Sequence, residues 1–436
     1  MDTTAPTVDL RWPLWRKLIF RFLFIYFAFV IAPWTWLDAI PGVGYVTEFY
    51  YRLMNWVVEL SNKRLFHVRD VLVQPNGSGD TSWAWAQTWM LLTLALIGCV
   101  IWSILDRKRP NYTQLNYWLC LFTRYYVAMV SFSYGILKLF ALQMYFPNLS
   151  QLATPLGDFL PMRLSWMFIG YSAPYQVFSG IMETIVGLLL LYRRTATAGA
   201  LMAVAVFTNV MLLNLSYDIP VKIYSTQIVI LSLYLVANES SRLLAFFVSN
   251  KQAQPSALYN FPLRKKWMRI SRIALKLLFI ILTVGLQFYN MKAYYKQLHT
   301  VAVKQPIQQG VYAVNKFVLN NDTVQSNYTD SLRWQDVIFD QSKQGSIKTA
   351  DTAYRQRYKR AYFFYEFDSA GQNLSFKKFQ GDSLLIASFR FELPDSNTVW
   401  LRGRQHNDSL FVELKRTNRH FQLAEKQFHW LSEANR

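Results

Sequence analysis

Apolar residues gather in long runs up to about residue 290 of the chain. Seven of these runs have about 20 residues, the length at which a helix crosses the hydrocarbon core of a bilayer. They fall at residues 17–36, 84–105, 117–142, 174–192, 196–216, 220–237 and 270–289. Between the first two runs, the stretch VTEFYYRLMNWVVELSNKRLF repeats its apolar positions at helical spacing. The pattern predicts seven transmembrane helices and an amphipathic helix on the outer interface.

From about residue 291 the hydrophobic period shortens to two. The segments RAYFFYEFD, SLLIASFRFEL, TVWLRGR and DSLFVELKR are short, aromatic and β-branched, and turn signals such as PDSN and HND separate them. This pattern is typical of antiparallel strands, whereas residues 291–350 are mixed and stay unassigned. The chain is therefore predicted to be an all-α polytopic membrane bundle followed by a C-terminal β-rich extracytoplasmic domain.

The predicted organisation has four parts. They are the N-terminal transmembrane helices with an outer amphipathic loop (1–114), a four-helix membrane core (115–250), a basic cytoplasmic loop with the last transmembrane helix (251–290), and the periplasmic β-rich domain (291–436).

The positions of the basic residues are more informative than the net charge of the chain. Much of the Lys and Arg behind the net charge of +20 lies next to apolar runs, as in DRKR at 106–109, YRR at 192–194 and the stretch RKKWMRISR. These flanks fall on one face if the helices alternate, and the positive-inside rule makes that face cytoplasmic. The N-terminus is then cytoplasmic and everything after about residue 290 lies outside. No basic stripe accompanies a nucleic-acid-binding motif, so nucleic acid is not expected as a partner.

Composition narrows the class further. The chain is 53% hydrophobic and 17% aromatic, which is too apolar for an average soluble enzyme. Only two cysteines occur, Cys99 and Cys120, both inside apolar runs, and this excludes a disulfide framework. The histidines lie outside the predicted spans and no zinc spacing is present, so neither metal nor haem is expected.

The third and fourth runs carry the candidate chemistry. Each has one stripe of small and polar residues at helical spacing, where a lipid-facing helix needs none. The stripes are Arg124, Ala128, Ser131, Gly135 and Lys138 in the third run, and Gln176, Gly180, Glu183 and Gly187 in the fourth. Small residues let helices approach closely, and a charge in hydrocarbon normally has a partner. We therefore predict that Lys138 and Glu183, the candidate catalytic residues, meet between these helices in the outer half of the membrane.

Further polar residues are predicted to contribute to a ligand-binding site around this pair. They are Arg124, Tyr134, Gln143, Asn209, Asn214, Asp218 and Lys222. Simpler interpretations exist for several of these residues and for the pair itself. Lys138, Asp218 and Lys222 are near enough to the interface to reach water. Glu183 fits a buried structural ion pair, Arg124 fits a lipid-phosphate contact, and Tyr134 and Gln143 fit ordinary helix ends.

The stretches GIMETIVGLLLLYRRTATAGALMAVAVFTNVMLLNLSYDIPVK and RYYVAMVSFSYGILKLF resemble the DoxX-like membrane proteins. In that family one helix carries Gly and Lys near its outer end, and the next carries Glu before a Gly-Leu-rich run closed by basic residues. Gly135, Lys138, Glu183 and Gly187 match this pattern, and the resemblance covers about residues 115–250. It implies a four-helix membrane core and a link to quinone or sulfur redox chemistry and to oxidative-stress complexes.

The order of a helix bundle and an extracytoplasmic β-rich domain also resembles the vitamin K-dependent carboxylase and its bacterial relatives, in which a lysine serves as a base in quinol-linked chemistry. We expect binding of a quinone or lipid in the outer half of the bundle, in a redox-associated or complex-forming role. The expected partners are membrane lipids and proteins that dock on the periplasmic domain. The alternatives are a non-catalytic assembly subunit of a cell-envelope complex and a carboxylase-like quinol-linked enzyme. Transport is disfavoured because neither internal repeats nor paired discontinuous helices are evident.

Overall fold

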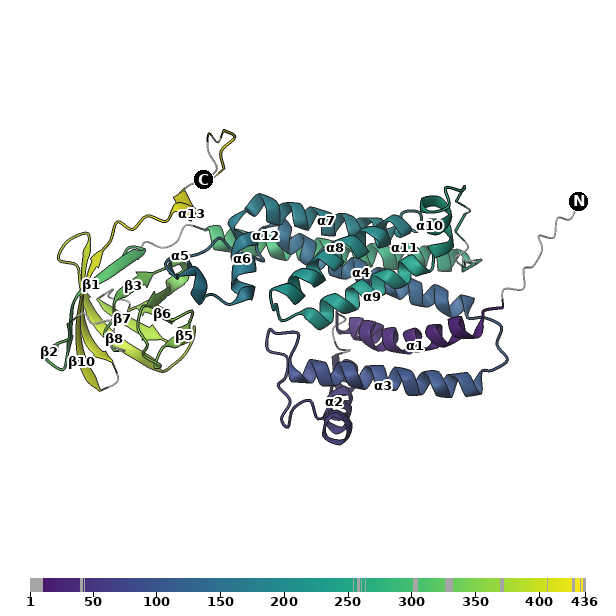
Figure 1. Ribbon diagram of the computed structural model, residues 1–436, viewed down its shortest axis with the longest axis horizontal. Helices are drawn as coiled ribbons and strands as arrows, with labels where there is room; N and C mark the ends of the chain where they lie inside the picture. The colour runs from purple at the N-terminus through teal and green to yellow at the C-terminus, as the bar shows by residue number, and fades with distance from the viewer. Residues whose placement is uncertain are drawn as a thin grey trace, which may run out of the picture. The chain divides into compact units, whose positions relative to one another are not determined.

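The protein forms two compact units, seen in a computed structural model (Figure 1). One is a helical unit of residues 1–143 and 174–296, and the other, the barrel unit, combines residues 144–173 with 297–436. The structure describes residues 11–39, 42, 44–253, 255–256, 259, 261–262, 264–300, 305–325, 332–368, 372–405, 407–425, 428–431 and 433.

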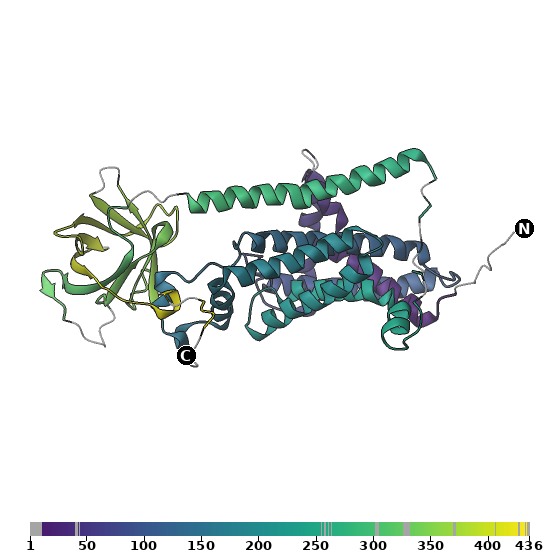
Figure 2. The ribbon, with the colours of Figure 1, turned by 90° about the horizontal axis from the view of Figure 1, so that it is seen from above.

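The helices of the helical unit follow the predicted runs closely. They are α1 (Leu14–Ile31), α2 (Gly44–Ser61), α3 (Ser82–Leu105), α4 (Thr113–Leu139), α7 (Ala173–Leu191), α8 (Ala196–Ser216), α9 (Lys222–Ala237), α10 (Ser240–Phe247), α11 (Lys266–Ile280) and α12 (Leu286–His299). Short helical turns η1 (Pro33–Ala39) and η2 (Asn62–Phe66) flank α2, and η4 (Ile281–Gly285) joins α11 and α12 into one long helix, which runs beside the bundle in Figure 2. The amphipathic stretch predicted between the first two runs is the helix α2.

Membrane-spanning length and composition are confirmed for several helices. Five helical segments qualify, namely Leu14–Trp36, Ser82–Leu105, Ala173–Leu191, Ala196–Ser216 and Lys266–His299. A sixth qualifies if α9 and α10, bent by 74° at their junction, form one span. The protein is therefore a multi-pass membrane protein. The third predicted run, α4, is not among these segments, because polar residues on its buried side lower its hydropathy. The count of seven spans stays a prediction.

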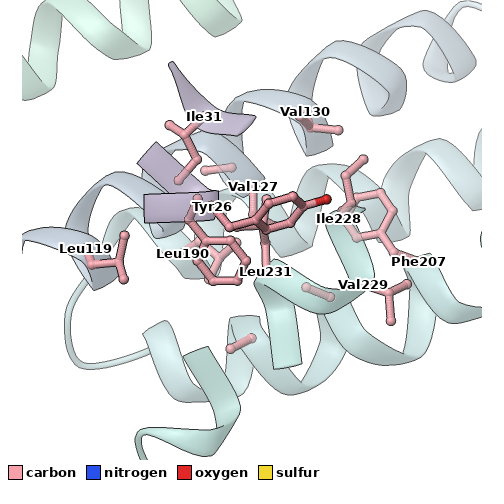
Figure 3. Packing of buried hydrophobic residues seen from close by; sticks show 14 of the residues in the cluster. Tyr26, Ile31, Leu119, Val127, Val130, Leu190, Phe207, Ile228, Val229 and Leu231 are labelled. Carbon is pink, nitrogen blue, oxygen red and sulfur yellow. The ribbon is translucent and has the colours of Figure 1, made fainter. Parts of the chain in front are cut away.

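A single apolar core holds the bundle together. In Figure 3 side chains from α1, α4, α7, α8 and α9 meet, among them Tyr26, Val127, Leu190, Phe207 and Leu231. Along α4, buried residues recur from Asn116 to Lys138 on successive turns. Because α4 contacts α1, α8 and α9, polar groups on its buried side are shielded by other helices rather than by lipid.

The predicted β-rich domain is confirmed, and it is a closed barrel. Its strands are β1 (Gly310–Leu319), β2 (Asp322–Thr323), β3 (Asp336–Phe339), β4 (Gln344–Ile347), β5 (Arg355–Arg357), β6 (Arg360–Phe367), β7 (Asn373–Lys377), β8 (Leu385–Glu392), β9 (Thr398–Gln405) and β10 (Asp408–Arg416). The ring runs β1-β3-β4-β6-β7-β8-β9-β10, with every neighbouring pair antiparallel, and β10 pairs back onto β1. The strands β6, β8, β9 and β10 coincide with the four alternating segments of the sequence.

Aromatic side chains fill the barrel. Trp334 is fully buried, and its ring lies about 6 Å from those of Phe317, Phe376 and Phe389 (5.9, 6.2 and 6.0 Å between centroids). A ring of eight strands encloses a space that large side chains can just fill. The inward-facing aromatic residues therefore form a packed core.

Residues 144–173, which connect α4 to α7, pack on the barrel. They contain α5 (Leu149–Leu152), η3 (Leu156–Asp158) and α6 (Pro161–Tyr171), and we call them the insert. The buried carboxylate of Asp340, just after β3, accepts hydrogen bonds from the backbone N–H of Leu149 (2.8 Å) and from the backbone N–H (3.2 Å) and hydroxyl of Ser150. The first turn of α5 is thus fixed by a side chain from the barrel. A short helix, α13 (Gln422–Glu425), follows β10.

Candidate functional site

Lys138 and Glu183 form the predicted ion pair between α4 and α7. The Nζ atom of Lys138 lies 2.5 Å from Oε1 of Glu183. The two side chains are only 8% and 1% exposed. Such burial is compatible with two charges only because each offsets the desolvation of the other. The predicted contact is confirmed, whereas a catalytic role for the two residues stays a prediction.

Glycines bring the two helices close enough for this pair to form. A Cβ atom added to Gly180 of α7 would lie 2.7 Å from the carbonyl oxygen of Gly135 on α4. One added to Gly187 would lie 2.7 Å from the ring of Phe132. Both distances are shorter than a carbon atom tolerates, so the seam admits only glycine without a shift. The two stripes of small residues therefore pack against each other, as the sequence predicted.

The Tyr134 side chain lies beside the pair. The centroid of the Tyr134 ring lies 5.8 Å from Nζ of Lys138 and 6.3 Å from the ring centroid of Tyr224 on α9. The lysine therefore has a carboxylate and the face of an aromatic ring as neighbours.

One oxygen of the pair has no hydrogen-bond partner in the part of the chain that the structure describes. Oε2 of Glu183 is buried and accepts no hydrogen bond from the described residues. An ionised carboxylate can accept several hydrogen bonds, so this oxygen has unused capacity next to a fixed cation. The arrangement can bind a group that carries both an acceptor, facing Lys138, and a donor, facing Glu183.

Two further predicted residues form no hydrogen bond to the pair in the described part of the chain. They are Gln143, which is half-buried and follows the C-terminal end of α4, and Asn214, which is buried near that of α8. The backbone N–H of Gln143 donates to the side-chain oxygen of Gln176 (3.2 Å), and Oε1 of Gln143 is itself buried without a partner among the described residues. Asn214 is 4% exposed, and its Nδ2 is likewise without an acceptor there. Each of these residues therefore has an unused polar atom, as Glu183 has.

Asp218 and Lys222 belong to a different cluster. Nζ of Lys222 lies 2.7 Å from Asp218 and 3.6 Å from Asp80. Asp80 also accepts hydrogen bonds from the backbone N–H groups of Lys222 (2.8 Å) and Ile223 (3.0 Å), so it caps the N-terminus of α9. Sequence reasoning missed Asp80, because nothing in its local sequence connects it to a helix that begins 142 residues later.

The last two predicted residues lie apart from the pair. Asn209 is exposed on the surface of α8. Arg124 lies 14 residues before Lys138 on α4, where its guanidinium is 5.4 Å from the ring of Tyr125 and its Nε is buried without an acceptor among the described residues. Of the nine predicted residues, the structure thus brings together Lys138, Glu183 and Tyr134.

No metal-binding cluster marks this position in the described part of the chain. Among the described residues, no group of three or more His, Cys, Asp or Glu side chains is placed to hold a metal ion. A cavity of about 390 Å³ lies at residues 109–114, and another of about 200 Å³ lies in the barrel unit. The binding capacity of the pair therefore rests on its polar atoms.

Comparison with known proteins gives one partial similarity. The chain is 33% identical over 84 residues to an uncharacterized protein of Bacillus subtilis, YwoB, and the match covers 19% of this chain and 54% of the relative. The chain thus spans about half the length of the curated relative that it matches. No protein-family model and no solved structure matches the chain.

Proposed function

We propose that the protein is a DoxX-like integral protein of the bacterial inner membrane that binds a lipophilic quinone, or a lipid, in the outer half of its helix bundle. Its role is redox-associated or complex-forming. The observation that carries the proposal is the buried Oε2 atom of Glu183, which has no hydrogen-bond donor among the described residues although it adjoins a lysine.

The polar atoms of the pair fit a quinone head group. A quinone carbonyl oxygen accepts hydrogen bonds, so it can bind the ammonium group of Lys138. A quinol hydroxyl donates a hydrogen bond, so it can bind Oε2 of Glu183. When bound, the quinone supplies two-electron redox chemistry, and the protein supplies orientation and charge.

In this proposal, Lys138 holds positive charge at the carbonyl oxygen and Glu183 accepts a proton or hydrogen bond from the hydroxyl. The close seam around Gly135 and Gly180 keeps water away from both.

The proposed placement in the membrane rests on charge and on the resemblance. The basic flanks of the apolar runs support a cytoplasmic N-terminus, and the barrel is then periplasmic, where its surface is available to protein partners.

A second candidate, a non-catalytic assembly subunit, is favoured by one specific observation. Lys138 and Glu183 already bond to each other at 2.5 Å inside a glycine seam, and such a pair can specify helix packing without any ligand.

A quinone assay on the purified protein tests the proposal. The full-length chain is extracted in a mild detergent, and bound quinone is quantified by solvent extraction and mass spectrometry. We expect stoichiometric quinone in the wild type and loss of most of it in Lys138→Met and in Glu183→Gln. Lys276→Met is the matched control, because Lys276 is also a lysine in an apolar helix but lies 3.6 Å from the ring of Tyr192.

Folding is monitored in every variant by far-UV circular dichroism and size-exclusion chromatography. Quinone retained in both pair variants, or absent from the folded wild type, would contradict the proposal and leave the assembly role. Loss of quinone in the Lys276→Met control as well would show that the assay reports general damage to the bundle.

A further inference from the structure

A cavity of about 200 Å³ in the barrel unit collects positive charge. It lies between the insert and the hairpin of β5 and β6. Among the described residues, four cationic side chains line it, Arg163, Arg355, Arg357 and Lys378, and no carboxylate does. We call this space the arginine cavity. It shares no residue with the Lys138–Glu183 pair, so its role is independent of the proposed quinone or lipid site.

The hairpin beside the cavity has an unfavourable backbone. β5 and β6 are joined by Tyr358 and Lys359, and both have positive φ angles, 53° and 54°. A two-residue turn of this kind normally uses Asn-Gly, because other side chains are strained there. An aromatic residue at positive φ is an uncommon outlier, and such strain of order 1 kcal/mol or more per residue persists only where the surroundings hold it.

The insert provides the contacts that hold this turn. Nε of Arg163 donates a hydrogen bond to the hydroxyl of Tyr358 (3.0 Å), and the ring of Tyr358 packs on Phe159 (5.2 Å between centroids). Nζ of Lys359 lies 2.6 Å from Asp158. Tyr358 and Lys359, the two residues with the unfavourable conformation, are therefore each bonded to the insert. The guanidinium of Arg357, the residue before the turn, lies 4.8 Å from the ring centroid of Tyr358.

The described residues provide no carboxylate that pairs with the charges in the cavity. Within the described residues, none of Arg163, Arg355, Arg357 and Lys378 forms an ion pair, and the nearby Asp158 is occupied by Lys359. Four like charges around one space repel each other, so a folded protein retains them at a cost unless an anion enters.

A buried hydroxyl adds a further donor. The hydroxyl of Tyr362 on β6 lines the cavity and has no hydrogen-bond partner among the described residues. Burial raises the pKa of Tyr362 to about 12, so the hydroxyl keeps its proton at neutral pH. The cavity thus combines four cations with an unused hydrogen-bond donor.

We propose that the arginine cavity binds a phosphate group. Two phosphate oxygens can accept parallel hydrogen bonds from the planar guanidinium group of an arginine. A phosphate also carries more negative charge than one carboxylate, which suits a cavity lined by four cations. The volume would hold about seven water molecules, which leaves room for a phosphate with a small esterified alcohol. The phosphate is either the free ion or part of the head group of an anionic phospholipid, because both present the same oxygens.

Titration of the full-length protein in neutral detergent with inorganic phosphate tests this site. Binding is followed by isothermal titration calorimetry at constant ionic strength, with chloride as the reference ion. We expect saturable binding that weakens about tenfold or more in Arg357→Gln and in Arg163→Gln, because each removes a charge-assisted hydrogen bond. A smaller loss is expected in Tyr362→Phe.

Arg402→Gln is the matched control. Arg402 is also an arginine against aromatic rings, 5.7 Å from Trp400 and 5.3 Å from Phe411, but it does not line the cavity. Because Arg163→Gln also removes a contact to the strained turn, the Arg357→Gln variant keeps the test valid if Arg163→Gln does not fold.

A second arm distinguishes the two sources of phosphate. The protein is reconstituted into vesicles of phosphatidylcholine alone or with phosphatidylglycerol, and the reactivity of Arg163 and Arg357 with phenylglyoxal is measured by mass spectrometry. Protection by inorganic phosphate supports the free ion, and protection only by phosphatidylglycerol supports a lipid head group. If neither protects these arginines and no phosphate binding is seen in detergent, the proposal is wrong.

Discussion

Asp80 caps helix α9 through the backbone N–H of Lys222, a residue 142 positions later in the chain. The same carboxylate bonds to Ile223 and lies 3.6 Å from Nζ of Lys222. We predict that Asp80→Asn lowers the free energy of unfolding of the helical unit by about 1 kcal/mol, because an amide has only one oxygen for the two N–H groups and no charge at the helix N-terminus. Denaturant titration of the detergent-solubilised protein measures it.

Asp218→Asn is the control for this prediction. Asp218 pairs with the same lysine at 2.7 Å, but its side chain is 81% exposed, so its loss should change stability by less than about 0.5 kcal/mol. Equal effects in the two variants would show that the charge of Lys222, and not the cap, is what matters.

The glycine seam gives a second prediction. We expect Gly180→Ala to destabilise the bundle by about 1 to 3 kcal/mol, because its Cβ would meet the Gly135 carbonyl oxygen at 2.7 Å and the backbone must move. Gly285→Ala, in the long helix of α11 and α12, is the control, since nothing lies within 4 Å of its Cβ. Thermal unfolding of both variants in one detergent makes the comparison, and a larger loss in Gly285→Ala would count against close packing of α4 and α7.

A double-mutant cycle on the ion pair gives a third prediction. Lys138→Met or Glu183→Gln alone should lower the free energy of unfolding by about 3 to 5 kcal/mol, because each leaves one buried group without its counter-charge. The loss is smaller if the remaining partner becomes neutral. The double variant should be clearly more stable than the sum of the two changes predicts. The free energy of unfolding of the wild type, the two single variants and the double variant is measured by titration with a denaturing detergent. Strict additivity would mean that the two groups are not coupled.

The barrel unit gives a prediction on pH. Burial raises the pKa of Asp340, and the hydrogen bonds from Ser150 and Leu149 offset this only in part. The folded pKa thus lies above the unfolded value of about 3.9, so the stabilising contribution is complete below about pH 4 and is lost as pH rises through the folded pKa. We expect the stability of the wild type relative to Asp340→Asn to fall as the pH rises above about 4.

Unfolding monitored by tryptophan fluorescence is suited to this measurement, because Trp334 is fully buried in the barrel. Asn at position 340 does not titrate, so the difference between the two proteins isolates this carboxyl. An advantage of the wild type that grows with pH would reverse the sign and contradict the prediction.

Local periodicity was sufficient for much of the fold. The helical spacing of Gly135, Gly180 and Gly187 predicted which faces of α4 and α7 meet, and alternation predicted β10 at residues 408–416. Depth along two antiparallel helices was enough to pair Lys138 with Glu183.

Relationships between distant segments could not be predicted in this way. Asp80, one of two carboxylates that pair with Lys222, is distant from it in sequence, and the closure of β10 on β1 involves a strand in a stretch with no clear period. Asn209 was assigned to the site by its depth, but depth does not say which way a side chain points around the helix, and Asn209 faces outward. The arginine cavity was missed because its cations come from three separate segments.

The pairing of β1 with β10 sets an order of events during synthesis. Leu149 of the insert emerges from the ribosome 191 residues before Asp340, which fixes the first turn of α5, and the ring closes only once the strand ending at Arg416 is made. Contacts between such distant segments form late, because the intervening chain must first be brought together. The insert therefore lacks its contacts with the barrel while the helices from α7 to α12 are being translated.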